Sequence, residues 1–226
     1  MFYFDSTIFI LFPAIILGIV AQRMVNIQYN KYKKVGNRNG YTGEQIARLM
    51  LDNEGLYDVK IMQSSVELSD NYNPGNKTLT LSKDVAQGRS IAAAGIAAHE
   101  VGHAIQHSKS YAPLKIRNAF VPVVNFSSNV WLLLFFVGIF FRIPSLLTVG
   151  IILFSVAVIF QVITLPVEFN ASSRALNILS SSNILYNDEL SGAKKVLSAA
   201  ALTYVAAALM SILQLIRLIA LKNRND

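Results

Sequence analysis

The fold is decided by an apolar stretch at residues 119–167, which reads AFVPVVNFSSNVWLLLFFVGIFFRIPSLLTVGIILFSVAVIFQVITLPV. Arg142 is its single charged residue, and it separates two uncharged segments of 23 residues each, Ala119–Phe141 and Ser145–Val167. A helix rises about 1.5 Å per residue, so each segment reaches about 34 Å and is long enough to cross a bilayer. Because only three residues separate the segments, the sequence predicts a tight antiparallel membrane hairpin.

Two further apolar segments flank the polar part of the chain. Ser6–Ala21 is uncharged, and the first positively charged residue after it is Arg23. A cleaved signal peptide would carry its cations before the apolar run, so this charge order favours an uncleaved anchor. Val196–Leu221 is rich in alanine and contains Arg217, whose long side chain could reach the headgroups from near a helix end. The sequence therefore predicts four membrane spans.

The composition agrees with a membrane protein. Of the 226 residues, 53% are hydrophobic and 15% are charged, whereas a soluble domain carries about 25% charge. The chain has no cysteine, which excludes disulfide scaffolds, cysteine-ligated zinc ribbons and thiol nucleophiles. The net charge of +7 suits anionic lipid. A nucleic-acid partner is not expected, because the cations flank the spans and do not form a groove.

The polar part, about Asn26–Arg117, has the signals of a small α+β domain. Thr42 is followed three residues later by Gln45, a capping-box pattern that begins a helix ending near Asn53 and Gly55. A second helix is predicted over Ser90–Ser108, which is rich in alanine and lacks proline. Short strands are predicted at three positions: Val59–Gln63, Val66–Ser69 and Thr78–Ser82, with a turn at 71–76 between the last two.

The helix predicted over Ser90–Ser108 contains a candidate catalytic motif, His99-Glu100-Val101-Gly102-His103. Residues four apart lie on one face of a helix, so His99 and His103 can both reach one zinc ion. Glu100 is rotated off that face, where it can accept a proton from water as a general base. Two of only three histidines in the chain have this spacing. The motif therefore predicts a metal site with one Zn²⁺ per chain.

A catalytic zinc needs a third protein ligand and an open position. His107 is the remaining histidine, but it lies two helical turns after His99, so we expect it to be a helix-end or supporting residue. The alternative third ligand is a carboxylate. Glu168 directly follows the membrane hairpin, and an even number of spans returns it to the side of the histidines. We therefore expect Glu168 as the third ligand, the alternative being an interfacial residue paired with Arg174.

At this point the chain resembles a known family, the YugP-like neutral zinc metallopeptidases of bacteria. The resemblance rests on four stretches, which are SIAAAGIAAHEVGHAIQ (90–106), PVEFNASSRAL (166–176), DNYNP (70–74) and AAALTYVAAAL (199–209). It covers about residues 40–221, and in outline the pattern is similar to HtpX-type membrane gluzincins. The resemblance implies a membrane-bound zinc endopeptidase with a zincin-like domain, in which His99, His103 and Glu168 bind the metal and Glu100 is the base.

The chain departs from the HtpX-type pattern at one position. Those enzymes place an Asp four residues after the ligand Glu, where it supports a zinc histidine, and this chain has Ser172. A serine accepts a hydrogen bond from an imidazole without a full charge. Asp70 is an alternative carboxylate for this role. Arg174 could orient Glu168 or bind substrate carbonyls, and Tyr72, Tyr204, Arg174 and His107 are candidates for oxyanion stabilisation.

Five segments follow from this interpretation. They are an anchor at 1–26, a catalytic domain at 27–118, a membrane hairpin at 119–167, the third-ligand helix and loop at 168–195, and a final span with its tail at 196–226. Sixteen Lys and Arg residues lie on the side of the catalytic domain and three on the other. The positive-inside rule therefore predicts a multi-pass protein of the cell membrane with a cytoplasmic active site.

The Thr78–Ser82 strand has two alternative roles. As a sheet edge, it could bind an extended substrate, or it could be plain core sheet.

Three functions are compatible with these features. The leading hypothesis is an endopeptidase that acts on membrane-associated or unfolded polypeptides at the bilayer. An intramembrane site-2-type protease is disfavoured, because the apolar run before His99 is only Ile91–Ala98 and no later span contains an Asp ligand. A non-catalytic membrane scaffold or transporter subunit with a metal site is the third hypothesis. An inactive relative would be expected to have lost Glu100 or a ligand, and this chain retains all of them.

Overall fold

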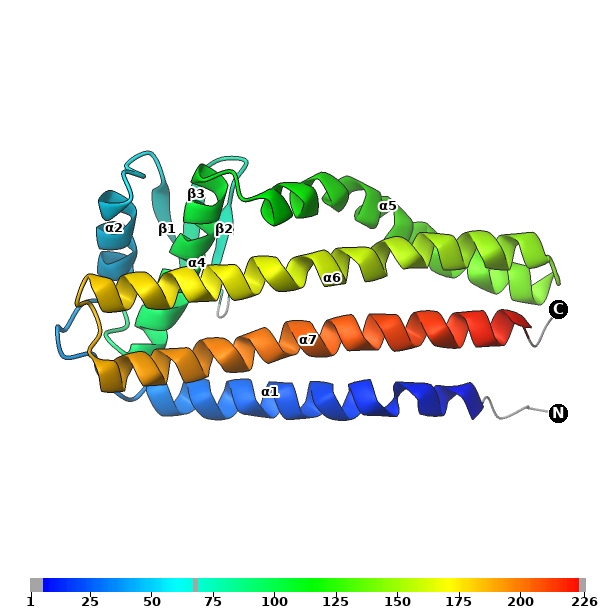
Figure 1. The fold of residues 1–226 in the computed structure, drawn as a ribbon, viewed down its shortest axis with the longest axis horizontal. Helices are drawn as coiled ribbons and strands as arrows, with labels where there is room; N and C mark the ends of the chain where they lie inside the picture. Colours follow the sequence, from blue (N-terminus) through cyan, green and yellow to red (C-terminus); the bar gives the residue numbers. More distant parts are fainter. Residues whose placement is uncertain (1–5, 67–68, 224–226) are drawn as a thin grey trace. The chain divides into compact units, whose positions relative to one another are not determined.

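The computed structural model describes residues 6–66 and 69–223 and is mainly helical (Figure 1). The long and short helices are η1 (Ser6–Leu11), α1 (Phe12–Tyr32), α2 (Gly43–Asn53), α3 (Lys83–Ala86), α4 (Ile91–Ser108), α5 (Ala112–Phe140), α6 (Pro144–Ser181) and α7 (Asn187–Asn223). The strands are β1 (Lys60–Ser64), β2 (Asn71–Asn73) and β3 (Thr78–Ser82). The chain groups into two compact units, which are described separately.

The first unit consists of residues 1–21, 116–165 and 202–226 and contains the apolar parts of the long helices. Four helices, at Thr7–Tyr32, Ala112–Phe140, Pro144–Ser181 and Asn187–Asn223, are long and apolar enough to cross a membrane. Only 11% to 33% of the most apolar window of each helix is buried inside the structure. Most of the apolar surface therefore faces outward, as expected for helices surrounded by lipid. These helices coincide with the four predicted spans.

Tight packing in the first unit brings α5 against α6. Gly150 of α6 lies against Trp131 and Phe135 of α5, and a Cβ at Gly150 would be 3.1 Å from the Trp131 carbonyl oxygen. Phe135, Leu147 and Leu218 belong to one buried cluster. The two long segments therefore form the predicted antiparallel hairpin. Arg217, inside the last apolar segment, donates from Nε to Thr7 Oγ1 at 3.3 Å.

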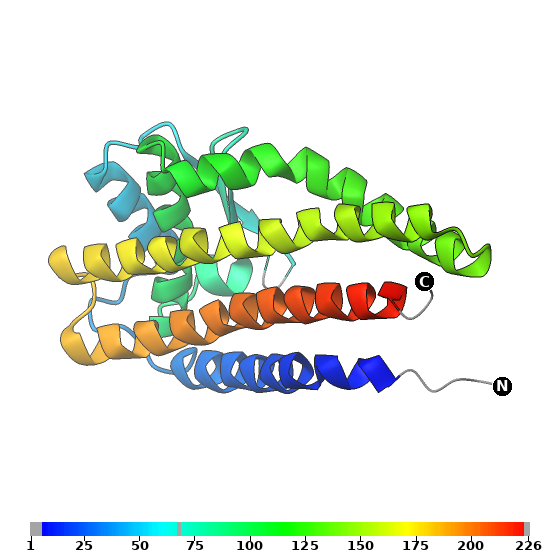
Figure 2. The same ribbon diagram turned by 45° about the vertical axis from the view of Figure 1, so that its right-hand side comes forward.

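The second unit consists of residues 22–115 and 166–201 and carries its own core. Helix α2 begins at Thr42 with the predicted capping box, because the Thr42 hydroxyl accepts from Gln45 and the Gln45 side chain accepts from the Thr42 backbone. Ser90 caps α4 by accepting from the Ala93 N–H. In both views α2 and the strands lie beside α4 (Figures 1 and 2). Helix α4 is mostly buried, since it packs on α2, the sheet and α6.

The sheet decides between the two alternatives for Thr78–Ser82, and it differs from the prediction in the position of its third strand. Its strand order is β1-β3-β2, with β1 parallel and β2 antiparallel to β3. Strand β3 is therefore central and not an edge, which agrees with its nearly complete burial. The third strand is Asn71–Asn73, inside the predicted turn. The predicted strand Val66–Ser69 includes residues 67–68, which lie outside the described residues, and neither Val66 nor Ser69 is in a strand.

The position of β2 has a physical reason. Tyr72 pairs with Leu79 across the antiparallel ladder, and Lys77 adopts a positive φ of 52° that reverses the chain just before β3. This hairpin gives the backbone of β3 a partner on its second side. The buried side chains of Leu79 and Leu81 then pack into the core of the second unit. The sequence pattern shows the polar turn, but it does not show that the turn's first residues join the sheet.

Candidate metal and catalytic site

Helix α4 holds two histidines of the sequence motif on one face. His99 and His103 are one helical turn apart, and their rings lie edge to face with centroids 4.7 Å apart. Their Nε2 atoms are 3.2 Å apart. Both imidazoles are thus directed with the same nitrogen toward a common point, as two ligands of one metal ion must be.

Glu168 of α6 completes a group of three. Its Oε2 lies 3.2 Å from Nε2 of His99 and 3.5 Å from Nε2 of His103, and the residue is 4% exposed. A tetrahedral zinc ion with bonds of about 2.0–2.1 Å separates its ligand atoms by about 3.3–3.4 Å. The three measured separations of 3.2, 3.2 and 3.5 Å match this spacing. The group could therefore hold a metal ion with two nitrogens and one oxygen.

Each imidazole is held from behind by an uncharged side chain. The Nδ1 atom of His99 is 3.0 Å from the Ser172 hydroxyl, and that of His103 is 3.1 Å from Oε1 of Gln106. Ser172 lies one turn after Glu168 on α6. Sequence reasoning missed Gln106, although its position three residues after His103 on the same helix was a usable signal. These contacts leave the Nε2 atoms to face Glu168.

Glu100 is the second residue of the motif and lies buried at 8% exposure. Within residues 6–66 and 69–223, no hydrogen bond or ion pair involves its carboxylate. Burial raises the pKa of the Glu100 carboxyl, and His99, His103 and Glu168 are among its electrostatic neighbours. A base whose pKa is raised toward the working pH is better suited to exchange protons with water. Glu100 is therefore free, in this part of the chain, to interact with a water molecule.

Comparison with known proteins decides the family. The family described as "Putative neutral zinc metallopeptidase" matches residues 7–223. The chain belongs to this family of zinc metallopeptidases. It is 50% identical over 212 residues to the "Putative membrane protease YugP" of Bacillus subtilis (strain 168). The aligned region covers 94% of each of the two chains. No solved structure gives a significant match.

Asp70, another predicted site residue, is hydrogen-bonded to the sheet. Asp70 accepts hydrogen bonds from the backbone and hydroxyl of Ser82, at 2.8 to 3.1 Å, so it joins β3 to the segment before β2. Burial raises the pKa of the Asp70 carboxyl, and the bonds from Ser82 only partly offset this effect. The imidazoles of His99 and His103 are hydrogen-bonded to Ser172 and Gln106, whereas the carboxylate of Asp70 is hydrogen-bonded to Ser82.

Tyr72 of β2 and His107 in the last turn of α4 form a pair. The Tyr72 hydroxyl is 2.9 Å from Nδ1 of His107, which links edge strand β2 to the last turn of α4. Both residues line a hollow of about 190 Å³ together with Ala104 and Ser108. His107 is not in the group that could hold a metal. The structure thus places it beside the sheet in the last turn of α4, which is the helix-end position that its spacing indicated.

Arg174 lies near Glu168 in sequence but contacts other groups. Its Nε donates to Oδ1 of Asn170 at 2.7 Å, and its guanidinium lies over the Tyr111 ring at 6.0 Å. Tyr204, another candidate, belongs to the first unit. The arrangement therefore supports a role for Arg174 in fixing this part of α6.

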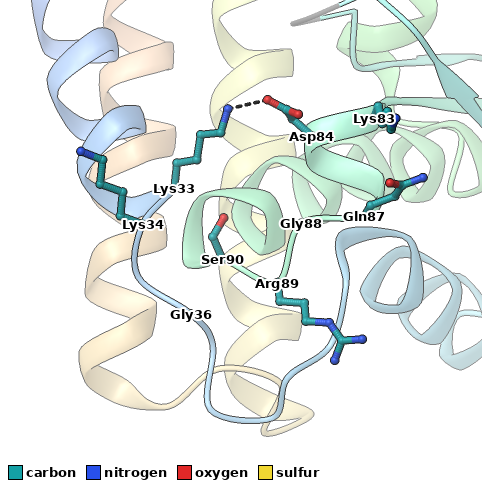
Figure 3. Close-up of a pocket in the computed structure, with 9 residues that line it drawn as sticks. All are labelled: Lys33, Lys34, Gly36, Lys83, Asp84, Gln87, Gly88, Arg89 and Ser90. Carbon is teal, nitrogen blue, oxygen red and sulfur yellow. Dashed lines mark hydrogen bonds and ion pairs between the residues drawn. The ribbon is translucent and has the colours of Figure 1, made fainter.

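A separate basic hollow of about 480 Å³ lies at the start of α4 (Figure 3). Lys33, which lines it, forms an ion pair with Asp84. Arg89 donates to the Gly40 carbonyl at 2.9 Å, and Figure 3 shows Lys34 and Arg89 pointing in different directions. The cations thus do not converge on one point, and we assign no ligand to this hollow.

Proposed function

We propose that this chain is a membrane-bound zinc endopeptidase whose ligands are His99, His103 and Glu168 and whose general base is Glu100. The observation that carries the proposal is the nearly equilateral set of three ligand atoms, 3.2 to 3.5 Å apart, together with the buried carboxylate of Glu100. Membership in the zinc metallopeptidase family supports it. The substrate would be a membrane-associated or unfolded polypeptide, reached from the cytoplasmic face.

The chain's own residues have distinct parts in this mechanism. A bound zinc ion supplies Lewis-acid polarisation of the scissile carbonyl and acidifies a water molecule. Glu100 accepts the proton of the attacking water at its carboxylate and delivers it to the leaving amine. Its burial and its position directly after His99 in α4 support this role. Ser172 keeps the His99 ring oriented while the proton moves.

The test separates the enzyme from a non-catalytic scaffold. Glu100→Gln keeps the shape of the side chain and both imidazoles but removes the proton acceptor. We would compare cleavage of an unfolded membrane-protein substrate by the wild type and this variant at matched zinc loading. General-base catalysis contributes about 10²–10⁴-fold, so the rate should fall by that order. Equal rates would overturn the protease mechanism and favour the scaffold.

A matched control comes from α2. Glu44 accepts a hydrogen bond from Gln63 at 2.7 Å and lies outside the three-residue group. Glu44→Gln makes the same chemical change at a surface position, so cleavage should stay at the wild-type rate. A drop equal to that of Glu100→Gln would show that the assay reports on folding and not on the base.

A further inference from the structure

Gln106 is a completely buried amide on α4, at 0% exposure, one turn after His103. A buried carboxamide needs partners for its oxygen and for its amino group. Both are present. Its Oε1 lies 3.1 Å from Nδ1 of His103, and its Nε2 donates to the Val167 carbonyl at 2.8 Å and to Oδ1 of Asn170 at 3.0 Å.

These contacts fix the direction of the amide and, with it, the hydrogen on His103. The Val167 carbonyl can only accept, so the amino group of Gln106 must face α6. Its oxygen then faces His103, and because that oxygen also can only accept, Nδ1 of His103 carries the hydrogen. The lone pair of the neutral ring is therefore on Nε2, the atom 3.5 Å from Glu168. One buried side chain thus selects the tautomer that can bind a metal.

The same amide ties down the helix that carries the third ligand. Val167 directly precedes Glu168, and Asn170 is held in turn by Nε of Arg174 at 2.7 Å. A shift of α6 relative to α4 would break the bonds of Gln106 to Val167 and Asn170. The position of Glu168 is therefore coupled to the orientation of His103 through this amide.

We propose that Gln106 is a positioning residue of the metal site, which fixes the His103 tautomer and holds Glu168 of α6 in register with it. The inference rests on the proposed zinc-binding function and deepens it. Partners behind a ligating histidine affect metal affinity by about 10–100-fold. The role of Gln106 is thus measurable as binding of the metal alone, without any substrate.

Two substitutions at this position separate positioning from packing. Gln106→Met keeps the length and bulk of the side chain but removes every hydrogen bond, so zinc affinity should fall by about 10–100-fold. Gln106→Glu keeps an acceptor oxygen for His103 but removes the amino group that donates to Val167 and Asn170, so its zinc affinity should lie between those of Gln106→Met and the wild type. Zinc affinity of the detergent-purified full chain would be measured by competition with a chelating indicator. Thermal unfolding would be measured alongside it.

A spectroscopic measurement follows the tautomer itself. The chain has only three histidines, so ¹⁵N-histidine labelling gives six ring-nitrogen signals, and variants of His99 and His107 assign them. In the wild type, Nδ1 of His103 should carry a slowly exchanging hydrogen. That signal should persist in Gln106→Glu and be lost or exchange rapidly in Gln106→Met. A residue that merely fills space would leave the signal unchanged.

The outcomes are distinguishable. If the wild type binds no zinc, the proposed function fails together with this inference. If the wild type binds one zinc and Gln106→Met binds it as tightly, only the positioning role is overturned. If Gln106→Met does not fold, Gln106→Glu decides. A retained Nδ1 hydrogen together with a zinc affinity weaker than that of the wild type supports positioning, whereas loss of that hydrogen, or an affinity equal to that of the wild type, overturns it.

Discussion

Gly102 lies directly against the backbone of Ala171, so α4 and α6 touch through main-chain atoms beside the metal-binding group. A Cβ added to Gly102 would be 2.5 Å from the Ala171 carbonyl oxygen, closer than real Cβ contacts come. Gly102 is the residue between Glu100 and His103 that has no side chain, and Ala171 lies between Glu168 and Ser172. The close approach is thus what brings Glu168 and Ser172 within reach of the histidines.

Gly102→Ala should therefore disrupt the site although it changes no ligand. The obstructing atom belongs to the backbone, so one helix must move, and overpacking of this kind costs about 1–3 kcal/mol. We expect weaker zinc binding and a lower thermal midpoint. Gly95→Ala on the same helix is the matched control, because its Cβ would be 3.4 Å from that of Ala193. Equal zinc affinity in the two variants would contradict the role of close approach.

Glu168→Gln and Glu100→Gln should differ in metal retention. The wild type is expected to carry about one zinc per chain, as a site with two histidines and one carboxylate requires. Glu168→Gln removes a charged ligand and should lose zinc on dialysis against a chelator, whereas Glu100→Gln should keep it. Metal analysis of the dialysed proteins measures this difference. Full zinc content in the double variant His99→Ala/His103→Ala would refute the ligand assignment.

Asp70 should make a pH-dependent contribution to stability. Burial raises the pKa of its carboxyl above the value of about 3.9 for an unfolded chain, so the folded state holds the proton more tightly. The stabilising contribution of protonated Asp70 is complete below about pH 3.9 and is lost as the pH rises through the folded pKa. Asp70→Asn stays neutral and keeps an oxygen for the Ser82 N–H.

The difference in thermal midpoint, Asp70→Asn minus wild type, should therefore increase between about pH 4 and pH 7. Other titrating groups are common to both proteins and cancel in this difference. Unfolding would be followed in detergent at several pH values. A difference that shrinks toward neutral pH would mean that the bonds from Ser82 stabilise the charged carboxylate by more than its burial costs.

The catalytic side of the membrane can be mapped with single cysteines, because the chain has none of its own. In the predicted topology, the exposed positions Asn76 and Ser182 lie on the catalytic side of the membrane and the exposed position Ser145 lies on the other side. With a cytoplasmic site, an impermeant thiol reagent applied to intact cells should label only Ser145→Cys. The reverse pattern would invert the predicted topology.

The features that the sequence predicted well are those that depend on neighbouring residues. Uncharged segments of sufficient length predicted the apolar helices, because helical rise and bilayer thickness set the same requirement. The Thr42 capping box and the extent of α4 were likewise predicted from residues a few positions apart. The strand at Asn71–Asn73 was missed, because its pairing with β3 depends on a chain reversal at Lys77 and not on alternation of polar and apolar residues.

The amino-acid sequence by itself determined the i, i+4 spacing of His99 and His103 and the presence of a carboxylate after the hairpin. Only the tertiary structure decided that Glu168 lies 3.2 Å from His99, that β3 is central in its sheet, and that Gln106 bonds to both His103 and Val167. The contacts of Glu168 with His99 and of Gln106 with Val167 join residues that are 69 and 61 positions apart in the chain. They arise from the close approach of α4 and α6 at Gly102, since a distance between two helices is set by packing of the whole unit and not by the periodicity of either helix.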